Sequence, residues 1–434
     1  MNFASKLIDP IIQSFQYVTG NLRVLTITDM LMNFSRRLVF PYASLYILAL
    51  GGNATQIGLI SFLSMVAGLF LLPVAGHITD HADRIRLLVL AGFLSTAFLV
   101  LNVIAPTWQV VALATLLSGL VVFQFPAYAS LVADALVPGR RGQGIGMSST
   151  ISSSLSLVAP FLAGLVVDRF GTNLGLRILY GVMVILSLVT TLIQRRFLRE
   201  TTSAPREPLH LNALLNSLRH SYRGIPDLVR SMSGSLRALA LVIMLCFVTQ
   251  GLVGSFWVVY AVDQIGLTGA QWGLTLLAES VVGIPLFIPA GILADRWGRT
   301  ASLTLALILS TVASLLFVIL HGFIAILILR AVLAACFVLG AASCVALMAE
   351  LVPSDSRGKM MAAIGQGGIQ LGTVGNPGGP GVGYLMVPPV MIAALAGGFL
   401  YSLNPVYPWI VATATGILAA VLTVVFVRSP TEKV

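Results

Sequence analysis

Five ionisable side chains lie in stretches of sequence that are otherwise apolar, and they are the first candidates for chemistry. Asp29, Arg36 and Arg37 belong to the segment TDMLMNFSRRLVFP. Glu279 and Arg330 lie in two later apolar stretches. Each residue is roughly nine positions, or ~14 Å of helix, from one end of its stretch. A charge at that depth in a membrane costs roughly 2.5–3.5 kcal/mol, so it is retained where it pairs or faces water.

The two acids suggest proton chemistry. A carboxylate in surroundings of low dielectric constant takes up a proton more readily than one in water, so it can bind and release protons near neutral pH. Glu279 and Asp29 are therefore the candidate proton carriers, and Glu279 is preferred for its depth. The alternative is a structural role, in which Asp29 pairs with an arginine and Glu279 pairs with Arg330.

The three arginines suggest a cationic cavity. On a helix, Asp29, Asn33 and Arg36 form one stripe at i, i+4 and i+7, and Arg37 lies beside it. Guanidinium groups can hold an anionic or zwitterionic substrate with two parallel hydrogen bonds. Neutral side chains that could line the same cavity, or pack between helices instead, are Gln124, Tyr128 and Gln250.

Composition indicates that these residues sit in a membrane protein. The 434-residue chain is 57% hydrophobic and 9% charged, with a mean hydropathy of +0.97, whereas a soluble domain is about 25% charged. Apolar runs of about 20 residues, enough to cross ~30 Å of hydrocarbon, are continuous rather than alternating and so predict helices. We expect an all-α membrane protein with twelve transmembrane helices, near residues 22–48, 55–78, 86–105, 108–133, 143–167, 175–194, 238–261, 270–293, 301–320, 322–349, 359–375 onward and 408–427.

The basic residues predict the orientation in the membrane. With the N-terminus in the cytoplasm, twenty of the 25 Lys and Arg residues lie on that side, and only Arg169 and Arg177 lie outside. This bias predicts a multi-pass protein of the inner or plasma membrane with both termini cytoplasmic. It also accounts for the net charge of +10, so we expect a lipid bilayer and no nucleic acid as partner.

The three cysteines give no sign of a metal or cofactor site. They lie in apolar spans without the spacing of zinc ligands, and we expect neither cofactor nor metal. The cysteines are Cys246, Cys336 and Cys344.

The chain repeats one plan in two halves. GHITDHADR, which begins at Gly76, recurs 215 residues later as GILADRWGR, which begins at Gly291, and ADALVPGRRG recurs as AELVPSDSRG. Each repeat falls at the same place in its half, as in transporters built from repeated bundles. We expect an N-terminal six-helix half (1–194), a cytoplasmic linker with an amphipathic segment (195–237) and a C-terminal six-helix half (238–434).

GILADRWGR resembles the loop motif of the major facilitator superfamily, Gly-x-x-x-Asp-Arg-x-Gly-Arg, which stands between helices 2 and 3 and again between helices 8 and 9. The first copy departs from the motif at His81 and Asp83, where the family prefers Arg and Gly. The resemblance covers essentially the whole chain. It implies two pseudo-symmetric six-helix bundles that work by alternating access, with helices 1, 4, 7 and 10 facing a central cavity.

The same resemblance implies a conformational latch in each half. In the family, the loop motif contacts the acids that end helices 4 and 10. The glycines would let a neighbouring helix approach closely, the aspartates would lie near a helix N-terminus, and the arginines would pair with the acids. The alternative is a solvated turn. The residues concerned are Gly76, Asp80, Arg84 and Asp134 in the first half and Gly291, Asp295, Arg299 and Glu350 in the second.

These features predict a secondary active transporter rather than an enzyme, with a small molecule and protons as partners, working as a monomer. The leading expectation is proton-coupled efflux of small amphipathic or drug-like compounds. SLSLVAPFLAG keeps Pro160 and Gly164 of the helix 5 motif of drug–proton antiporters, but its other glycines are replaced. The alternatives are transport of an anionic metabolite, favoured by the arginines, and a transport-inactive receptor or scaffold.

One glycine- and proline-rich stretch, GNPGGPGVGYLMVPPV (residues 375–390), interrupts helix 11. It predicts a broken helix, or an outward loop followed by a short re-entrant piece. Main chain that is broken at membrane depth must be buried in protein or face water.

Overall fold

The computed structural model of the chain describes residues 18–137, 139–200, 225–365, 367–372 and 382–428. Most of the predicted linker and about half of the stretch 375–390 thus lie outside the described residues. In α4 the surroundings of several residues, among them Gly76 and Asp80, are likewise not described.

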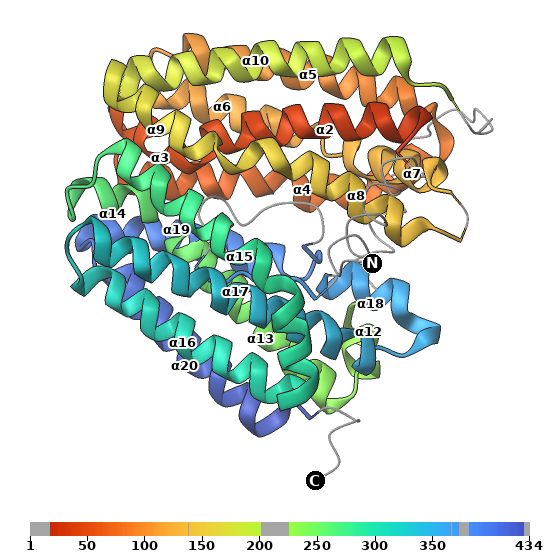
Figure 1. Cartoon of the computed structure of the whole chain (residues 1–434), viewed down its shortest axis with the longest axis vertical. Helices are drawn as coiled ribbons and strands as arrows, with labels where there is room; N and C mark the ends of the chain where they lie inside the picture. The colour runs from red at the N-terminus through yellow and green to blue at the C-terminus, as the bar shows by residue number, and fades with distance from the viewer. Residues whose placement is uncertain (1–17, 138, 201–224, 366, 373–381, 429–434) are drawn as a thin grey trace, which may run out of the picture.

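The described elements are helices, and Figure 1 shows them in two groups. The N-terminal group consists of α2 (Gly20–Val39), η2 (Phe40–Tyr42), α3 (Ala43–Ala49), α4 (Ala54–His81), α5 (Arg84–Ile104), α6 (Trp108–Gly119), α7 (Gln124–Ala135), α8 (Arg141–Ser154), η3 (Leu155–Leu157), α9 (Ala159–Phe170) and α10 (Thr172–Phe197). The C-terminal group consists of α12 (Ile225–Ser231), α13 (Gly234–Val253), α14 (Trp257–Asp263), α15 (Gly269–Trp297), α16 (Arg299–Ile319), α17 (Phe323–Leu351), η4 (Ser354–Ser356), α18 (Arg357–Ile364), α19 (Val387–Leu403) and α20 (Tyr407–Phe426).

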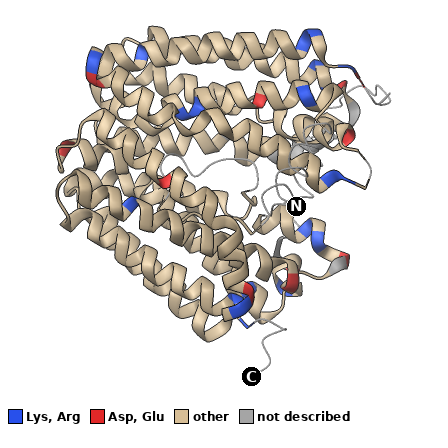
Figure 2. Ribbon diagram, in the orientation of Figure 1, with Lys and Arg blue, Asp and Glu red and all other residues tan. Residues whose placement is uncertain are grey.

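Length and hydropathy identify most of the expected membrane spans. Within the described residues, nine helical stretches are long and apolar enough to cross a membrane, and the pair α6–α7, bent by 44°, makes a tenth. Charged side chains concentrate near the helix ends and are sparse between them (Figure 2). The prediction of a helical, multi-pass membrane protein is confirmed. α2 is absent from the ten spans because Asp29, Arg36 and Arg37 interrupt its apolar surface.

The start of α4 and the start of α15 carry the same cap. Asn53 and Gln56 form a capping box at α4, and Thr268 and Gln271 form one at α15. In each, the N-cap side chain accepts a hydrogen bond from the backbone N–H three residues later at 3.2 Å. The two caps are 215 residues apart, the same interval that separates the copies of the loop motif.

The two groups touch near one end of their helices. α4 packs on α19, α9 on α15, and α3 on α14; in Figure 1 the groups meet on the left and spread apart on the right. An added Cβ at Gly58 would lie 2.6 Å from the carbonyl oxygen of Ala394, so the two main chains are in contact there. Gly58 lies near the start of α4, so the contacts are at the end opposite to the loop motifs.

The predicted eleventh helix is interrupted earlier than expected. α18 ends at Ile364 because Gly365 adopts a φ of 102°, in the left-handed region that terminates a helix. The expected continuation of this helix past residue 375 is therefore wrong. The described chain continues as non-helical backbone through 367–372, and helix resumes with α19 at Val387.

Candidate functional site

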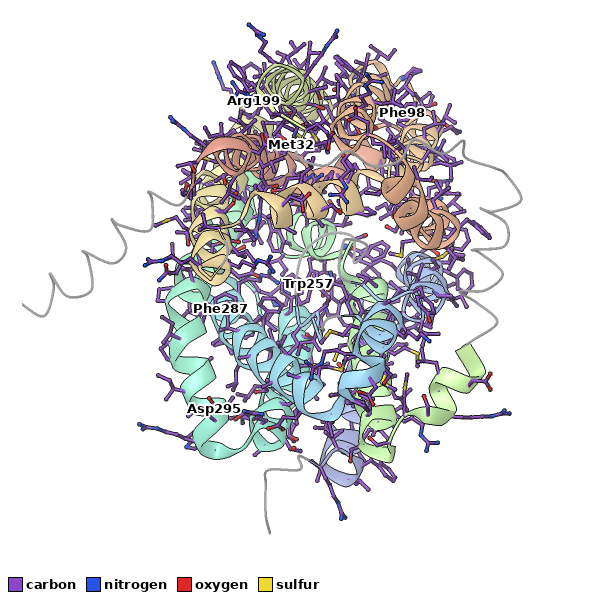
Figure 3. All side chains as sticks on the ribbon, turned by 90° about the vertical axis from the view of Figure 1, so that its right-hand side faces the viewer. Met32, Phe98, Arg199, Trp257, Phe287 and Asp295 are labelled. Carbon is purple, nitrogen blue, oxygen red and sulfur yellow. The ribbon has the colours of Figure 1, made fainter. Side chains whose placement is uncertain are left out.

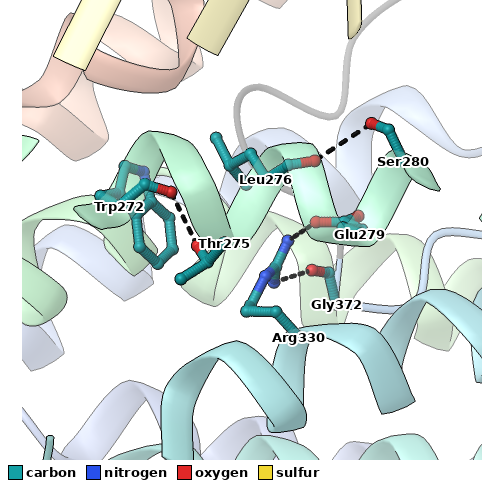
Figure 4. A network of polar contacts seen from close by, with 7 residues as sticks. All are labelled: Trp272, Thr275, Leu276, Glu279, Ser280, Arg330 and Gly372. Carbon is teal, nitrogen blue, oxygen red and sulfur yellow. Dashed lines mark hydrogen bonds and ion pairs between the residues drawn. The ribbon is translucent and has the colours of Figure 1, made fainter. Parts of the chain in front are cut away.

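Glu279 of α15 and Arg330 of α17 form an ion pair inside the C-terminal group (Figure 4). Arg330 Nη2 donates to Glu279 Oε2, and Nη1 donates to the carbonyl oxygen of Gly372 at 2.5 Å. The Arg330 side chain has no exposed surface, while 22% of the Glu279 side chain is exposed. The structure thus brings these two predicted residues together and leaves the acid as the accessible partner.

Two indole rings cover the Arg330 guanidinium. Its Cζ lies 5.2 Å from the ring centre of Trp257 and 5.7 Å from that of Trp272, and such contacts contribute about 0.5–2 kcal/mol each. Trp257 belongs to α14, which packs on α3 of the N-terminal group, and is labelled in Figure 3. Both indole N–H groups and Arg330 Nε are buried without an acceptor among the described residues. These rings were not predicted as site residues from the sequence, although tryptophans in aliphatic spans were a usable signal.

The charges of α2 are arranged differently. Asn33 Nδ2 donates to Asp29 Oδ2 at 3.1 Å, and Ser152 of α8 also hydrogen-bonds the Asp29 carboxyl. Among the described residues, no salt bridge joins Asp29 to Arg36 or Arg37. A direct Asp29–arginine salt bridge is therefore absent from the described residues, although the Asp29 and Arg36 charges attract each other. Arg36 lies seven residues, or ~10 Å of helix, beyond Asp29, so a contact must span two turns.

Arg36 and Arg37 differ in exposure. Arg37 is exposed, whereas Arg36 is half-buried. Tyr128 of α7 is half-buried and close enough to interact electrostatically with Asp29 and Arg36. The three residues therefore form one polar cluster between α2 and α7.

The two predicted glutamines occupy different positions. Gln124 is the first residue of α7 and lies one helical turn before Tyr128. Gln250 lies in α13, and 2% of its surface is exposed. Helix packing is the simpler role for Gln250, because a substrate could reach it only after a rearrangement.

Both predicted latch arginines pair with the predicted acids. Arg84 Nη1 lies 2.6 Å from Asp134 Oδ2. Arg299 contacts Glu350 through Nη1, and its Nη2 lies 3.2 Å from Asp295 Oδ1. The two pairs join the ends of α7 and α17 to the starts of α5 and α16, at equivalent places in the two groups.

One detail of the predicted latch is wrong in this conformation. An added Cβ at Gly291 would meet nothing within 4 Å, so no helix approaches closely there. Asp295 is 65% exposed, and its carboxylate contacts the side chain of Arg299, the first residue of α16. The physical reason is that the last turn of α15 is largely exposed, as Trp297 at 62% also shows. The surroundings of the equivalent residues, Gly76 and Asp80, are not described.

Asp83, where the first loop motif departs from the family pattern, makes a contact of its own. Asp83 caps α5 by accepting a hydrogen bond from Arg86 N at 2.9 Å, and it hydrogen-bonds the Glu200 carboxyl. Burial raises the pKa of Glu200, and the neighbouring Asp83 raises it further. Burial also pushes the pKa of Asp83 upward, but its hydrogen bonds to Arg86 and Glu200 outweigh this and lower it.

The contact between the groups contains polar residues that sequence reasoning missed. Asp168, near the end of α9, accepts hydrogen bonds from Gly269 N at 2.7 Å and Ala270 N at 2.8 Å, at the N-terminus of α15. The Tyr42 hydroxyl lies 2.7 Å from Pro160 O and 2.9 Å from Gly269 O. An acid at the end of an apolar span was the available signal for Asp168.

The described residues offer no cluster of three or more His, Cys, Asp or Glu that could hold a metal ion. The ionisable groups that remain are suited to protons and to charged small molecules.

Comparison with known proteins agrees with the geometry. The sequence profile of the Major Facilitator Superfamily matches residues 25–246 and 239–434. The chain is 26% identical over 299 residues to the multidrug resistance protein MdtG of Citrobacter koseri, covering 67% of this chain and 70% of that protein. It is 25% identical to MdtG of Serratia proteamaculans over 63% of this chain and 65% of that protein.

Solved transporters share the fold at low sequence identity. A mutant of the nucleoside transporter NupG superposes with a TM-score of 0.67 at 12% identity, covering 93% of this chain and 99% of that one. An inward-facing bacterial homologue of the human lysosomal transporter Spinster gives 0.62 at 15% identity, covering 94% and 98%. Because its sequence profile match extends over nearly the whole length, this chain belongs to the Major Facilitator Superfamily of membrane transporters.

Proposed function

We propose that the protein is a secondary active transporter that exports small amphipathic or drug-like compounds in exchange for protons, by alternating access. The observation that carries this proposal is Glu279. It lies about ten residues, or ~15 Å, from the start of α15, so it is close to mid-membrane depth. It is partly exposed and has a buried cation, Arg330, as its partner. A carboxyl group in this position can bind a proton from one side and release it to the other.

The proposed architecture has twelve spans in two six-helix halves, with residues 195–237 as the linker. Ten spans follow from length and hydropathy; α2–α3 and the interrupted α18–α19 would supply the other two. The matching caps and latch ion pairs of the two groups support the internal repeat. The Lys and Arg bias supports cytoplasmic termini, so the loop motifs would be cytoplasmic and the contacts between the groups would lie on the outer side.

In the proposed cycle, Glu279 binds a proton while the cavity faces outward and releases it to the cytoplasm. Arg330 compensates the ionised carboxylate. The Arg84–Asp134 and Arg299–Glu350 pairs would break and re-form as the cytoplasmic ends move. Similarity to proteins named for multidrug resistance supports drug-like substrates. We propose a monomer, with lipid, protons and the transported compound as its partners.

A second candidate substrate class is the anionic metabolite. It is favoured by Arg37, which is exposed, and by Arg36, because neither makes a salt bridge among the described residues. An anionic group could occupy both guanidinium groups with charge-assisted hydrogen bonds.

The test is transport by the purified protein in liposomes that contain a pH-sensitive dye. Organic cations, anions and neutral compounds are supplied one at a time, and proton movement is recorded with and without an imposed pH gradient. We expect at least one amphipathic compound to drive proton movement. Substrate-independent fluorescence across the whole panel would contradict the proposal, and movement with anions alone would favour the second candidate.

A further inference from the structure

The backbone between α18 and α19 runs alongside α17. An added Cβ at Gly367 would lie 3.0 Å from Val345 Cα, and one at Gly372 would lie 2.8 Å from Leu333 Cδ2. Between these points, an added Cβ at Gly340 would lie 2.7 Å from Ile369 Cδ1. Val345 and Leu333 are about 18 Å apart along α17, and five extended residues cover about 17 Å. Residues 367–372, called here the extended segment, therefore lie stretched along this helix.

The chain then returns to the end of α18. Tyr384 N donates to Ala362 O at 3.2 Å, and Leu385 N donates to Ala363 O at 3.1 Å. Gly365 and Val382 form an isolated bridge, and α19 begins at Val387. The extended segment is thus part of an insertion into a single interrupted span, and it reaches into the helices of the C-terminal group.

One guanidinium joins the extended segment to the proposed proton carrier. Arg330 Nη1 holds the carbonyl oxygen of Gly372, and Nη2 holds Glu279 (Figure 4). Gly372 has a φ of 65°, which side chains rarely adopt, and it presents its main-chain carbonyl oxygen to the guanidinium. Arg330 is wholly buried, and its guanidinium also lies over the faces of Trp257 and Trp272.

We propose that Arg330 is a positioning residue that couples the protonation of Glu279 to the position of the extended segment. This inference rests on the proposed role of Glu279 as proton carrier. When Glu279 is ionised, its charge and the Gly372 carbonyl together orient the guanidinium. When Glu279 binds a proton, the pair loses its charge–charge attraction, and the balance shifts toward the carbonyl and the two rings. The extended segment, held through Gly372, shifts with the guanidinium.

Other charged or titratable groups also lie on α15 and on the helices that pack against it. Asp168 holds the first residues of α15, and Asp295 and Arg299 lie at its far end. Arg330 is the described residue that forms an ion pair with Glu279. The remaining groups of this kind on the packed elements α9, α14 and α17 are Arg169, Tyr260, Asp263, Cys336, Cys344 and Glu350.

The test measures labelling of the extended segment as a function of pH. Gly368 is exposed and an added Cβ there would meet nothing within 4 Å, so Gly368→Cys is a tolerated reporter. The matched control is Gly146→Cys in α8, which has the same exposure and the same free space. Both are placed in the full chain with the three native cysteines replaced by serine. Dividing the two maleimide labelling rates removes the intrinsic pH dependence of the thiol.

We expect the labelling ratio to change several-fold with pH in the parent protein. It should become independent of pH in Glu279→Gln and in Arg330→Met. Arg330→Lys keeps the buried charge, but its single ammonium cannot hold both acceptors in the fork geometry of Arg. Arg330→Lys is therefore the second test variant, to be used if Arg330→Met does not fold. Its labelling ratio should also be independent of pH. A pH-dependent ratio that survives in the Arg330 variants would overturn the inference.

Proton movement in the same liposomes separates this inference from the proposed function. If substrate drives proton movement that Glu279→Gln abolishes, while the parent labelling ratio is independent of pH, only the coupling through Arg330 is wrong. If no compound drives proton movement, the proposed function is wrong. If the labelling ratio of the parent is then also independent of pH, the coupling between Glu279 and the extended segment is wrong as well.

Discussion

The two groups of helices hold their intramembrane charges in different ways. In the C-terminal group, Glu279 and Arg330 form an ion pair, and the cation is sealed beneath two indole rings. In the N-terminal group, Asp29 is held by neutral hydrogen bonds, while Arg37 is exposed. The difference suggests a division of labour, in which the paired acid handles protons and the unpaired cations meet the substrate.

Stability should show the largest contrast between the groups. Arg330→Met leaves the Glu279 carboxylate without its partner, and breaking a buried pair in this way costs about 3–5 kcal/mol. Arg36→Met breaks no ion pair among the described residues and should cost less than about 1 kcal/mol. Thermal unfolding in detergent measures both. The double variant Arg330→Met/Glu279→Gln should recover most of the loss, and equal losses for the two single variants would contradict the comparison.

Proton coupling should show the next largest contrast. Glu279→Gln removes the titratable group and should reduce substrate-driven proton movement by roughly tenfold or more. Downhill movement of substrate should continue, because the Gln side-chain oxygen can still accept a hydrogen bond from Arg330 and hold it in place. Asp29→Asn, whose carboxyl is already held by Asn33 and Ser152, should have a smaller effect. The opposite order, with Asp29→Asn the more damaging, would transfer the role of proton carrier to α2.

Substrate charge should distinguish the exposed cation of α2. Arg37→Gln should raise the KM for anionic compounds about tenfold, through loss of a charge-assisted contact, and leave neutral compounds unaffected. Arg230→Gln is a matched control, because it removes one positive charge from a side chain that is 82% exposed at the surface. If both substitutions change KM equally, the effect belongs to the general surface charge rather than to the cavity.

Much of the fold could be predicted from sequence because a helix that crosses the hydrocarbon core of a membrane needs a continuous apolar run of about 20 residues. Continuous apolar runs located the spans, and the interval of 215 residues between loop motifs revealed the repeat. The Glu279–Arg330 contact was also within reach, since two opposite charges at equal depth must be compensated.

Other features depend on tertiary geometry that one sequence does not contain. Asp29 and Arg36 lie on one stripe, yet the distance between two helical turns and the neighbour Ser152 decide that no ion pair forms. The indole rings over Arg330 come from α14 and α15, and their approach depends on how three helices pack. The break at Gly365 was placed too late because a single left-handed glycine, not the glycine-rich run, ends the helix.

The smallest expected contrast lies at the ends of the loop motifs. Asp83 in the N-terminal group corresponds to Gly298 in the C-terminal group, 215 residues later. Gly298 turns the chain with a φ of 93°, whereas Asp83 caps α5 and hydrogen-bonds Glu200. Among the described residues, a pair of carboxyl groups at this place is found in the N-terminal group, so its loop motif should respond to mild acid.

The pH dependence follows from the two pKa shifts. The pKa of Glu200 is raised above its ordinary value of 4.5, so its contribution to stability is full below that value and is lost as pH rises through the raised pKa. The pKa of Asp83 is lowered from 3.8, so its contribution is full above 3.8 and is lost only at more acid pH. Between about pH 4 and 7.5, therefore, only the Glu200 contribution changes.

Glu200→Gln keeps a neutral hydrogen-bonding partner for Asp83 at every pH. Its melting temperature should equal that of the parent near pH 4 and exceed it slightly, by about 1–2 °C, near pH 7.5, because Glu200 is exposed and solvent screens its interaction with Asp83. Unfolding scans of the two proteins across this range measure the difference. Asp227→Asn, at a side chain that is 85% exposed, controls for loss of an acid at the surface. A difference that grows toward acid pH would mean that Asp83, not Glu200, holds the shared proton.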